Sequence, residues 1–363
     1  MSRPTCVVIL AAGEGTRMRS SRPKPLHQLC GRAMVLYVLD AAAQENVRAT
    51  VVVVGHDANW VEKELSDGSH VAMRLTFVEQ NEQLGTGHAV SVALPVLDEA
   101  IGETDGDVLI LPGDTPLLRR SSVARLLAVH RETNAAMTVL GARVDEPTGY
   151  GRLIHAKDGT LERIVEERDA SVAERRINEI NTSIMVVRQS LLGPALRRVD
   201  RQNVQHEYYL TDLVGVLHAM GHVTGSLMLD DASEAAGVND RLQLSRVERV
   251  LRTRINDQWM SRGVTMWNPE DTYVDADVEL AAEVSLLPGT ILRGHCVIAR
   301  GAQIGPNATL RDVYVGENAY VGSVEATRAR IGADAHVSSF VVLSPGADVA
   351  TGEIVTPPSP RSH

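Results

Sequence analysis

The sequence lacks any long run of apolar residues. The two longest runs, residues 6–12 and 33–39, are far shorter than the ~20 residues that a membrane-spanning helix needs. The first residues also lack the basic, apolar and small-residue segments that follow one another in a secretory signal. We therefore expect a cytoplasmic protein with no membrane partner.

Cysteine is scarce as well. The 363 residues include three cysteines, Cys6, Cys30 and Cys296, which are too few and too far apart for a disulfide framework or a zinc cluster. We predict that they are reduced thiols in the core.

Positive charge and aromatic rings are also in short supply. The chain has 36 Lys and Arg against 46 Asp and Glu, and aromatic residues make up 3% of it. Nucleic-acid binding relies on basic surface and often on stacked rings, so we expect no nucleic-acid partner. The basic residues are concentrated, however: residues 1–32 contain six Arg and Lys and one acid, Glu14. Such a basic segment suits a small polyanion.

A length of 363 residues suggests two or three domains. Strand-like runs at residues 5–10, 50–55 and 107–111 alternate with helix-like stretches such as residues 34–44. This alternation predicts an α/β domain with a mainly parallel sheet over residues 1–228. Residues 240–261 then show apolar residues at helical spacing, which fits either a connecting strut or an ordinary amphipathic helix.

Beyond residue 262 the period changes to six. Aliphatic residues recur every six positions, pause after Leu310 and resume at Ile331. A period of six predicts a parallel β-helix, in which each turn points apolar residues inward. We place it at residues 263–350 and expect residues 351–363 to be a disordered tail. The positions are Leu280, Leu286, Leu292, Ile298, Ile304, Leu310, Ile331, Val337, Leu343 and Val349.

A glycine-rich loop directly follows the first strand. Residues 10–17 have the sequence Leu-Ala-Ala-Gly-Glu-Gly-Thr-Arg and are followed by Pro23-Lys24. Small residues let the backbone approach a ligand, exposed N–H groups bind phosphate oxygens, and Arg17 and Lys24 add positive charge. The loop lacks the Gly-Lys-Ser/Thr end of a Walker loop and the third glycine of a dinucleotide fingerprint. It fits a phosphate cradle, or a simple strand-to-helix turn.

Two further loops carry polar groups. Asp114 follows the strand at residues 107–111, and a carboxylate at the end of such a strand commonly binds magnesium against phosphates, although a Gly-Asp pair also makes ordinary turns. Gln80 and residues 83–88 form a small-residue loop with amide side chains, which suits recognition of a nucleobase or a plain capping loop. We expect His88 to be packed there rather than catalytic.

Together these motifs resemble the family of bacterial bifunctional N-acetylglucosamine-1-phosphate uridylyltransferase/glucosamine-1-phosphate acetyltransferases. The resemblance spans nearly the whole chain and follows its order. It is carried by Leu-Ala-Ala-Gly-x-Gly-Thr-Arg, Gln-Leu-Gly-Thr-Gly-His-Ala, Gly-Asp-x-Pro-Leu, Gly-Tyr-Gly-Arg, Ile-Val-Glu, Glu-Ile-Asn-Thr, Glu-Tyr-Tyr-Leu-Thr-Asp and Gly-Val-Asn.

The resemblance implies magnesium-dependent uridylyl transfer from UTP to N-acetylglucosamine 1-phosphate, with catalytic roles for Arg17 and Lys24. The UTP phosphates would also be bound by Leu10, Ala11, Ala12 and Gly13. Uracil and ribose would be bound by Gln80, Gly85 and Thr86. The sugar would be bound by Gly151, Glu166 and Asn181. The magnesium ion would be bound by Asp114 and Asn239.

The implied fold is a doubly wound nucleotidyltransferase domain at residues 1–228, a linker with a long helix at 229–262, and a left-handed β-helix that forms a homotrimer. In the family, the acetyltransferase residues lie in further coils of the β-helix, so we expect acetyltransferase activity to be absent here. Ser183 stands where the family usually has glycine after Asn-Thr. It motivates an alternative enzyme that uses another sugar 1-phosphate or nucleotide. A second alternative is a non-catalytic nucleotide-sugar binding scaffold.

Overall fold

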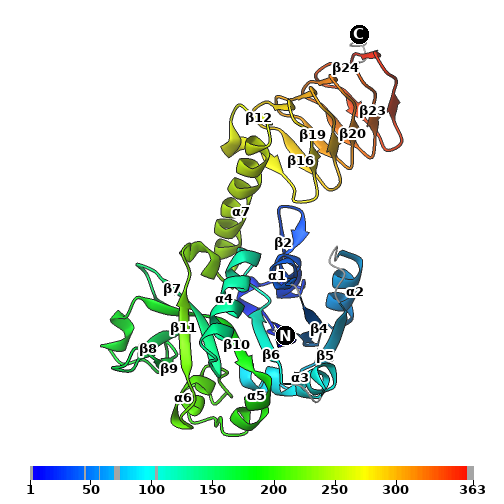
Figure 1. The fold of residues 1–363 in the computed structure, drawn as a ribbon. Helices are drawn as coiled ribbons and strands as arrows, with labels where there is room; N and C mark the ends of the chain where they lie inside the picture. The colour runs from blue at the N-terminus through cyan, green and yellow to red at the C-terminus, as the bar shows by residue number, and fades with distance from the viewer. Residues whose placement is uncertain (1–2, 45, 57, 69–73, 103–104, 358–363) are drawn as a thin grey trace. The chain divides into compact units, whose positions relative to one another are not determined.

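The structure is a computed structural model that describes residues 3–44, 46–56, 58–68, 74–102 and 105–357. The chain folds into two units, which Figure 1 shows. Unit 1 consists of Met1–His27 and Ala33–Leu244, and unit 2 consists of Gln28–Arg32 and Ser245–His363. Within the described part of the chain, no helix is both long and apolar enough to cross a membrane.

A nine-stranded sheet forms the centre of unit 1. Its main strands are β1 (Thr5–Ala11), β4 (Val47–Val54), β5 (Leu75–Glu79), β6 (Asp107–Pro112), β7 (Met137–Arg143), β10 (Glu179–Arg188) and β11 (Thr224–Met228). They follow the order β11-β7-β10-β6-β1-β4-β5. All neighbours pair in parallel except β10, which is antiparallel to both β6 and β7. A hairpin of β8 (Arg152–His155) and β9 (Leu161–Val165) joins the sheet through β10. The predicted mainly parallel α/β domain is therefore confirmed.

Helices cover both faces of this sheet. They are α1 (Met34–Ala42), α2 (Ala58–Gly68), α3 (Thr86–Ile101), α4 (Arg120–Glu132), α5 (Gln189–Leu196) and α6 (Asp212–Ala219). On one face, Val8 of β1 belongs to a core with residues of α3, α5 and α6. On the other, Ile9 belongs to a core with residues of α1, α2 and α4. Because successive strand residues face opposite sides, residues 6–11 of β1 are all apolar and serve both cores.

The carboxyl ends of β1 and β6 lie side by side. Leu10 is aligned with Pro112 in the parallel pair, and the Gly113 N–H donates to the Leu10 carbonyl at 2.9 Å. The glycine-rich loop and the loop that carries Asp114 therefore start from the same edge of the sheet, where α/β proteins usually bind ligands.

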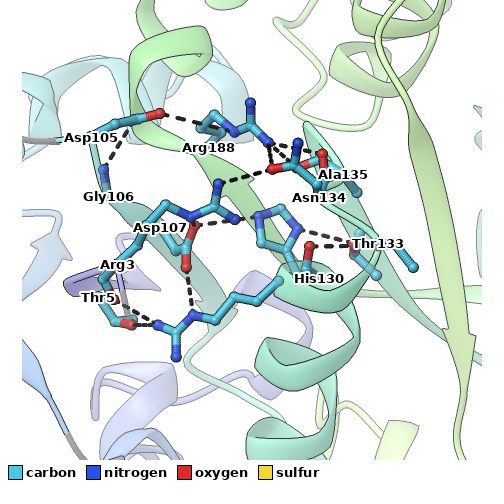
Figure 2. Close-up of polar contacts among 12 residues, drawn as sticks. Arg3, Thr5, Asp105, Gly106, Asp107, His130, Thr133, Asn134, Ala135 and Arg188 are labelled. Carbon is cyan, nitrogen blue, oxygen red and sulfur yellow. Dashed lines mark hydrogen bonds and ion pairs between the residues drawn. The ribbon is translucent and has the colours of Figure 1, made fainter. Parts of the chain in front are cut away.

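The opposite end of β6 is held by a buried ion cluster, shown in Figure 2. Asp107 is fully buried; its Oδ2 accepts from Arg131 Nε at 2.8 Å, and its Oδ1 lies 3.0 Å from Arg3 Nε and 3.5 Å from His130 Nε2. Burial alone would raise the pKa of Asp107, but hydrogen bonds from His130 and Arg131 and the charge of Arg3 lower it overall. Arg131 also donates to Thr5 Oγ1 at 2.7 Å, so the cluster joins β1, β6 and α4.

Unit 2 contains three parallel sheets of short strands. The first holds β12 (Thr265–Met266), β15 (Ser285–Leu286), β18 (Gln303–Ile304), β21 (Tyr320–Val321), β24 (His336–Val337) and β27 (Ile354–Val355). The second holds β13 (Tyr273–Val274), β16 (Ile291–Arg293), β19 (Thr309–Arg311), β22 (Glu325–Thr327) and β25 (Val342–Leu343). The third holds β14 (Glu279–Leu280), β17 (Val297–Ile298), β20 (Tyr314–Val315), β23 (Arg330–Ile331) and β26 (Asp348–Val349).

These stacked sheets confirm the predicted β-helix, and all ten six-residue positions are buried in its core. The pause in the period also has a structural basis. Between Leu310 and Ile331 the inward positions are Val315, Val321 and Ala326, so several steps shorten to five residues while the strands stay aligned.

The β-helix continues past residue 350, where the sequence placed its end. Strand β27 pairs in parallel with β24, so the described part of the expected tail includes a strand of the last coil. Residues 358–363 of that tail lie outside the described residues.

The predicted long helix is α7 (Arg241–Ser261), and Ile255 and Trp259 on it pack against the β-helix core. Unit 2 also includes most of a small hairpin, β2 (Gln28–Leu29) and β3 (Arg32–Ala33), whose Cys30 carbonyl accepts from the Ala276 N–H at 2.9 Å. Short 3-10 helices complete the elements: η1 (Thr16–Met18), η2 (Lys24–Leu26), η3 (Glu174–Arg176), η4 (Ala232–Ala235) and η5 (Pro269–Asp271).

The three cysteines, Cys6, Cys30 and Cys296, are buried and not disulfide-bonded, as predicted. Burial raises the pKa of each thiol, to about 12 for Cys30.

Candidate active site

A cavity of about 430 Å³ opens at the carboxyl ends of the strands in unit 1. Its walls come from the loops that follow β1, β5, β6 and β9, and from parts of β10 and the segment before α7. It is lined by every residue that the sequence proposed for the site except Arg17. These residues are Leu10, Ala11, Ala12, Gly13, Lys24, Gln80, Gly85, Thr86, Asp114, Gly151, Glu166, Asn181 and Asn239.

The glycine-rich loop leaves β1 and runs directly into this cavity. Gly15 has a φ of 62°, in the left-handed region that favours glycine. A Cβ atom at this position would lie 2.6 Å from the Cβ of Lys24, closer than real Cβ contacts allow. Glycine therefore lets η2, which carries Lys24, pack against the loop after β1.

Charged and polar side chains meet at the wall of the cavity. Lys24 Nζ donates to Asp114 Oδ2 and, at 2.9 Å, to Asn239 Oδ1. Arg17 Nη2 also donates to Asn239 Oδ1, at 3.0 Å, so Arg17 reaches the same group although it does not line the cavity. The Val238 N–H donates to the Asp114 carbonyl at 2.9 Å, which fixes the two loops to each other. We call Arg17, Lys24, Asp114 and Asn239 the charge centre.

The oxygen atoms of Asp114 and Asn239 in the charge centre fit a magnesium ion that is bound together with phosphates. Asp114 and Asn239 point oxygens at one cationic group, the Lys24 ammonium. Magnesium prefers oxygen ligands and usually takes one or two carboxylates, with substrate phosphates and waters completing its shell. Among the described residues, no group of three or more His, Cys, Asp and Glu side chains is placed to hold a metal. The protein thus offers a partial set, which suits an ion shared with a phosphate substrate.

One end of the cavity is built by the loop between β5 and α3. Gln80 is buried, and its Nε2 donates to the Gly85 carbonyl at 3.1 Å. Thr86 Oγ1 accepts from the Leu210 N–H at 3.1 Å, and the Gly87 N–H donates to the Tyr208 carbonyl at 2.8 Å. The segment after α5 therefore holds this loop in place.

The other end is built by β8, β9 and β10. Glu166 Oε1 accepts from Thr211 Oγ1 at 2.9 Å. Burial raises the pKa of Glu166, and the charge of Asp169 adds to this effect, while the Thr211 hydrogen bond opposes it. Asn181 is buried at the cavity wall, and its backbone N–H donates to the Gly151 carbonyl at 2.8 Å. Carboxyl and amide groups of this kind suit the hydroxyl and amide groups of a sugar.

A buried arginine ties the loops at this end together. Arg152 is 1% exposed, and its Nη2 pairs with Glu167 Oε2 at 2.7 Å. Its guanidinium also donates to the carbonyls of Ile177, at 3.1 Å, and of Tyr150. Because Gly151 and Glu166 adjoin these partners, Arg152 helps to set the positions of both.

Ser183 lies on an irregular part of β10, where the pairing with β7 shifts between Asn181 and Ile184. Its φ is 63°, and its backbone N–H donates to Asn181 Oδ1 at 2.9 Å. Glycine adopts this conformation without strain, whereas a residue with a Cβ does so at a cost. Ser183 therefore keeps a glycine-like turn at the wall of the cavity.

Comparisons with known proteins agree with this arrangement. Residues 7–180 match the family described as MobA-like NTP transferase domain. The chain is 43% identical over 331 residues to the bifunctional protein GlmU of Thermobifida fusca, covering 91% of this chain and 68% of that protein. It is 41% identical to the GlmU of Streptomyces avermitilis, covering 95% and 70%, and 42% identical to that of Trichlorobacter lovleyi, covering 94% and 73%. The chain belongs to the GlmU family.

Membership in the GlmU family makes the chain a sugar-1-phosphate nucleotidylyltransferase of the UDP-N-acetylglucosamine pyrophosphorylase type. The cavity also contains residues that the sequence did not single out for a role. Tyr150, Glu207 and Gly237 line it, and each belongs to a motif that carried the resemblance to the family. Ala235 lines it too, but it lies in the short helix η4 and belongs to no such motif, so no sequence signal marked it.

Proposed function

We propose that the chain transfers a uridylyl group from UTP to N-acetylglucosamine 1-phosphate, giving UDP-N-acetylglucosamine and pyrophosphate, in a magnesium-dependent reaction. The observation that carries this proposal is the position of the charge centre. Lys24, Asp114 and Asn239 lie in one cavity with an amide-containing loop at one end and Glu166 and Asn181 at the other. A nucleotide and a sugar phosphate would therefore meet at the cations.

In the proposed reaction, an oxygen of the sugar phosphate attacks the α-phosphorus of UTP. The bond between the α-phosphorus and the bridging oxygen breaks, and pyrophosphate leaves with the electron pair. Such transfers depend mainly on positioning and on stabilising charge at the phosphate oxygens. Lys24 would hold phosphate oxygens around the reacting phosphorus. Arg17, at the exposed side of the charge centre, would hold the departing pyrophosphate.

Asp114 and Asn239 would hold the magnesium ion, which when bound supplies Lewis-acid stabilisation of phosphate charge. The backbone of Asp114 is held by the loop contact with Val238. The backbone of residues 10–13 lines the cavity next to the charge centre and would offer N–H groups to the triphosphate.

The two ends of the cavity would bind the parts of the substrates that do not react. Gln80, Gly85 and Thr86 would bind uracil and ribose, and Gly151, Glu166 and Asn181 would bind the sugar. Ser183 favours a second candidate function at the sugar end, because it adds a hydroxyl to the wall there. This second candidate uses a sugar 1-phosphate other than N-acetylglucosamine 1-phosphate.

A panel assay of pyrophosphate release tests both candidates. The purified chain is incubated with UTP, CTP, ATP, GTP or dTTP, and with N-acetylglucosamine 1-phosphate, glucose 1-phosphate or glucosamine 1-phosphate. We expect release with UTP and N-acetylglucosamine 1-phosphate when magnesium is present, and loss of release when EDTA is added. Exclusive use of another sugar phosphate would favour the second candidate. Nucleotide binding with no release from any pair would instead indicate a binding scaffold.

Two further expectations can be tested with the same purified protein. The 363-residue chain is predicted to lack acetyltransferase activity, so acetyl-CoA should not be consumed in the presence of glucosamine 1-phosphate. We also propose a homotrimer formed through the β-helix, on whose outer surface Val297, Tyr314 and Val342 are exposed. The mass of the protein in solution tests this, and a monomeric mass would contradict it.

A further inference from the structure

A backbone carbonyl favours one orientation of the Gln80 amide. Gln80 is 2% exposed and lies at the cavity wall. Its Nε2 is 3.1 Å from the carbonyl oxygen of Gly85, which can only accept a hydrogen bond. This carbonyl therefore favours the orientation in which the amide nitrogen faces Gly85. Its Oε1 makes no hydrogen bond to any residue in the described part of the chain, so it is the free acceptor that this side chain presents to a ligand.

His88 contacts the same amide nitrogen from the first turn of α3. Its Nδ1 lies 3.1 Å from Gln80 Nε2 and 3.0 Å from the Glu82 carbonyl oxygen. When Nδ1 carries no proton, it accepts the second N–H of the Gln80 amide, and both amide hydrogens are then bonded. When Nδ1 carries a proton, it donates to Glu82 and leaves that buried N–H without a partner. Leaving a buried donor unpaired is unfavourable. The first arrangement is therefore favoured, because both N–H groups of the Gln80 amide then have an acceptor.

We propose that His88 is a positioning residue that selects the nucleobase through Gln80. With both amide hydrogens bonded to Gly85 and His88, the cavity presents an acceptor, Gln80 Oε1, at this point. An acceptor pairs with the imide N–H of uracil or thymine, whereas cytosine has an acceptor, N3, in the equivalent place. If the amide rotated, it would present N–H groups and accept cytosine instead. Loss of the His88 contact therefore lowers discrimination between UTP and CTP.

This inference rests on the proposed function, because it assumes that a nucleotide occupies this end of the cavity. The test measures the dissociation constants of UTP and CTP by calorimetry, and kcat/KM for both where turnover is seen. We expect His88→Leu to reduce the preference for UTP over CTP by about tenfold, the effect of one hydrogen bond. The preference for dTTP over CTP should fall by a similar factor, because thymine has the same imide group.

Three variants separate this role from general damage. Asn at position 88 offers a side-chain oxygen close to the place of Nδ1, so His88→Asn should restore most of the UTP preference. His218→Leu is the matched control: His218 is also half-buried on a helix but makes no hydrogen bond to Gln80, and the His218→Leu substitution should leave the ratio unchanged. In a Gln80→Leu background, His88→Leu should cause no additional change in the ratio.

The proposal is wrong if His88→Leu folds and binds UTP but keeps the wild-type UTP to CTP ratio. It is equally wrong if the ratio falls by the same factor in the Gln80→Leu background, because His88 would then act without Gln80. Absence of binding for all nucleotides in the wild-type protein would overturn the proposed function as well. Thermal unfolding of each variant identifies any that fail to fold, and His88→Asn then provides the decisive comparison.

Discussion

Asp107 and Asp114 lie at the two ends of the same strand, β6, and their surroundings differ. Asp107 is fully buried and surrounded by Arg3, His130 and Arg131 (Figure 2). The side chain of Asp114 is 23% exposed and shares Lys24 with Asn239 in a cavity. A fully buried carboxylate with its own cations beside it is not accessible to a ligand. A carboxylate that faces a cavity beside a lysine can exchange that lysine for a substrate-bound cation.

This comparison predicts that one aspartate serves activity and the other serves stability. Asp114→Asn removes a charge aimed at the reacting phosphates, so kcat for pyrophosphate release should fall by about 10²- to 10³-fold. The melting temperature should change little, because the side chain is partly exposed and its loop is held by backbone contacts. Steady-state kinetics and calorimetry measure the two effects. Near wild-type turnover in this variant would contradict the assignment of Asp114 to the charge centre.

Asp107→Asn should have the opposite profile. It leaves two arginines without their buried counter-charge, and breaking such a group typically costs about 3–5 kcal/mol of unfolding free energy. Activity below the melting temperature should stay within a few-fold of the wild type. Denaturant unfolding of both proteins measures the cost. A fold that is as stable as the wild type would show that the cluster does not hold the strands.

The same variant sharpens the comparison through pH. The pKa of Asp107 is lowered in the folded protein from an ordinary value of 3.8. A lowered pKa means that the carboxylate contributes its stability above the unfolded value and loses it as the pH falls through the folded value. The difference in unfolding free energy between wild type and Asp107→Asn should therefore be full at pH 7 and shrink below about pH 4.

A third carboxylate, Asp212, tests the effect of burial where no cation among the described residues lowers the pKa. Its pKa is raised to about 6, first by burial and then by the charges of Glu166, Asp200 and Asp169. The unfolded chain releases this proton at a lower pH than the folded protein, so stability falls as the pH rises from about 4 to 6. Asp212→Asn should therefore stabilise the protein at pH 7.5 by about 1 kcal/mol, a value reduced by solvent screening, and by less at pH 4. Equal stabilisation at both pH values would argue against a raised pKa.

The smallest expected effect concerns Ser183. A residue with a Cβ in the left-handed region costs about 1–2 kcal/mol of stability. Glycine removes this cost, but part of the gain is lost because glycine has more conformational freedom in the unfolded chain. Ser183→Gly should therefore raise the unfolding free energy by about 0.5 kcal/mol, measured by denaturant titration. If the Ser183 hydroxyl also contacts the sugar, the KM for the sugar phosphate should change while that for UTP stays constant. A loss of stability would show that the serine side chain makes a favourable contact.

The sequence predicted the loops after β1 and β6 because both strands are continuous apolar runs that end in small and polar residues. It predicted the β-helix because Leu286, Ile304 and the related positions keep one spacing over several coils. The five-residue steps between Leu310 and Ile331 could not be foreseen, because strand alignment decides them and not local pattern.

The contacts that distinguish Asp107 from Asp114 could not be predicted from the sequence either. Asp107 opens a strand like many other polar residues, and its partners come from distant positions in the chain. The pairing of Lys24 with Asp114 and Asn239 joins three loops that no local motif connects. His88 was expected to be packed, and its contact with Gln80 depends on the side-chain geometry of a helix that starts one residue after Gly85.

The distance along the chain between the members of the charge centre has a consequence for biosynthesis. Arg17 and Asn239 are 222 positions apart, and Lys24 and Asn239 are 215 apart. Because a ribosome delivers the N-terminal segment first, Arg17 and Lys24 emerge long before Asn239, whose side-chain oxygen accepts from both. A growing polypeptide therefore lacks the side-chain oxygen that Arg17 and Lys24 share until residue 239 arrives. Substrate affinity would appear in a single late step. A ligand present during translation would therefore bind and stabilise only chains whose first unit has been synthesised and folded.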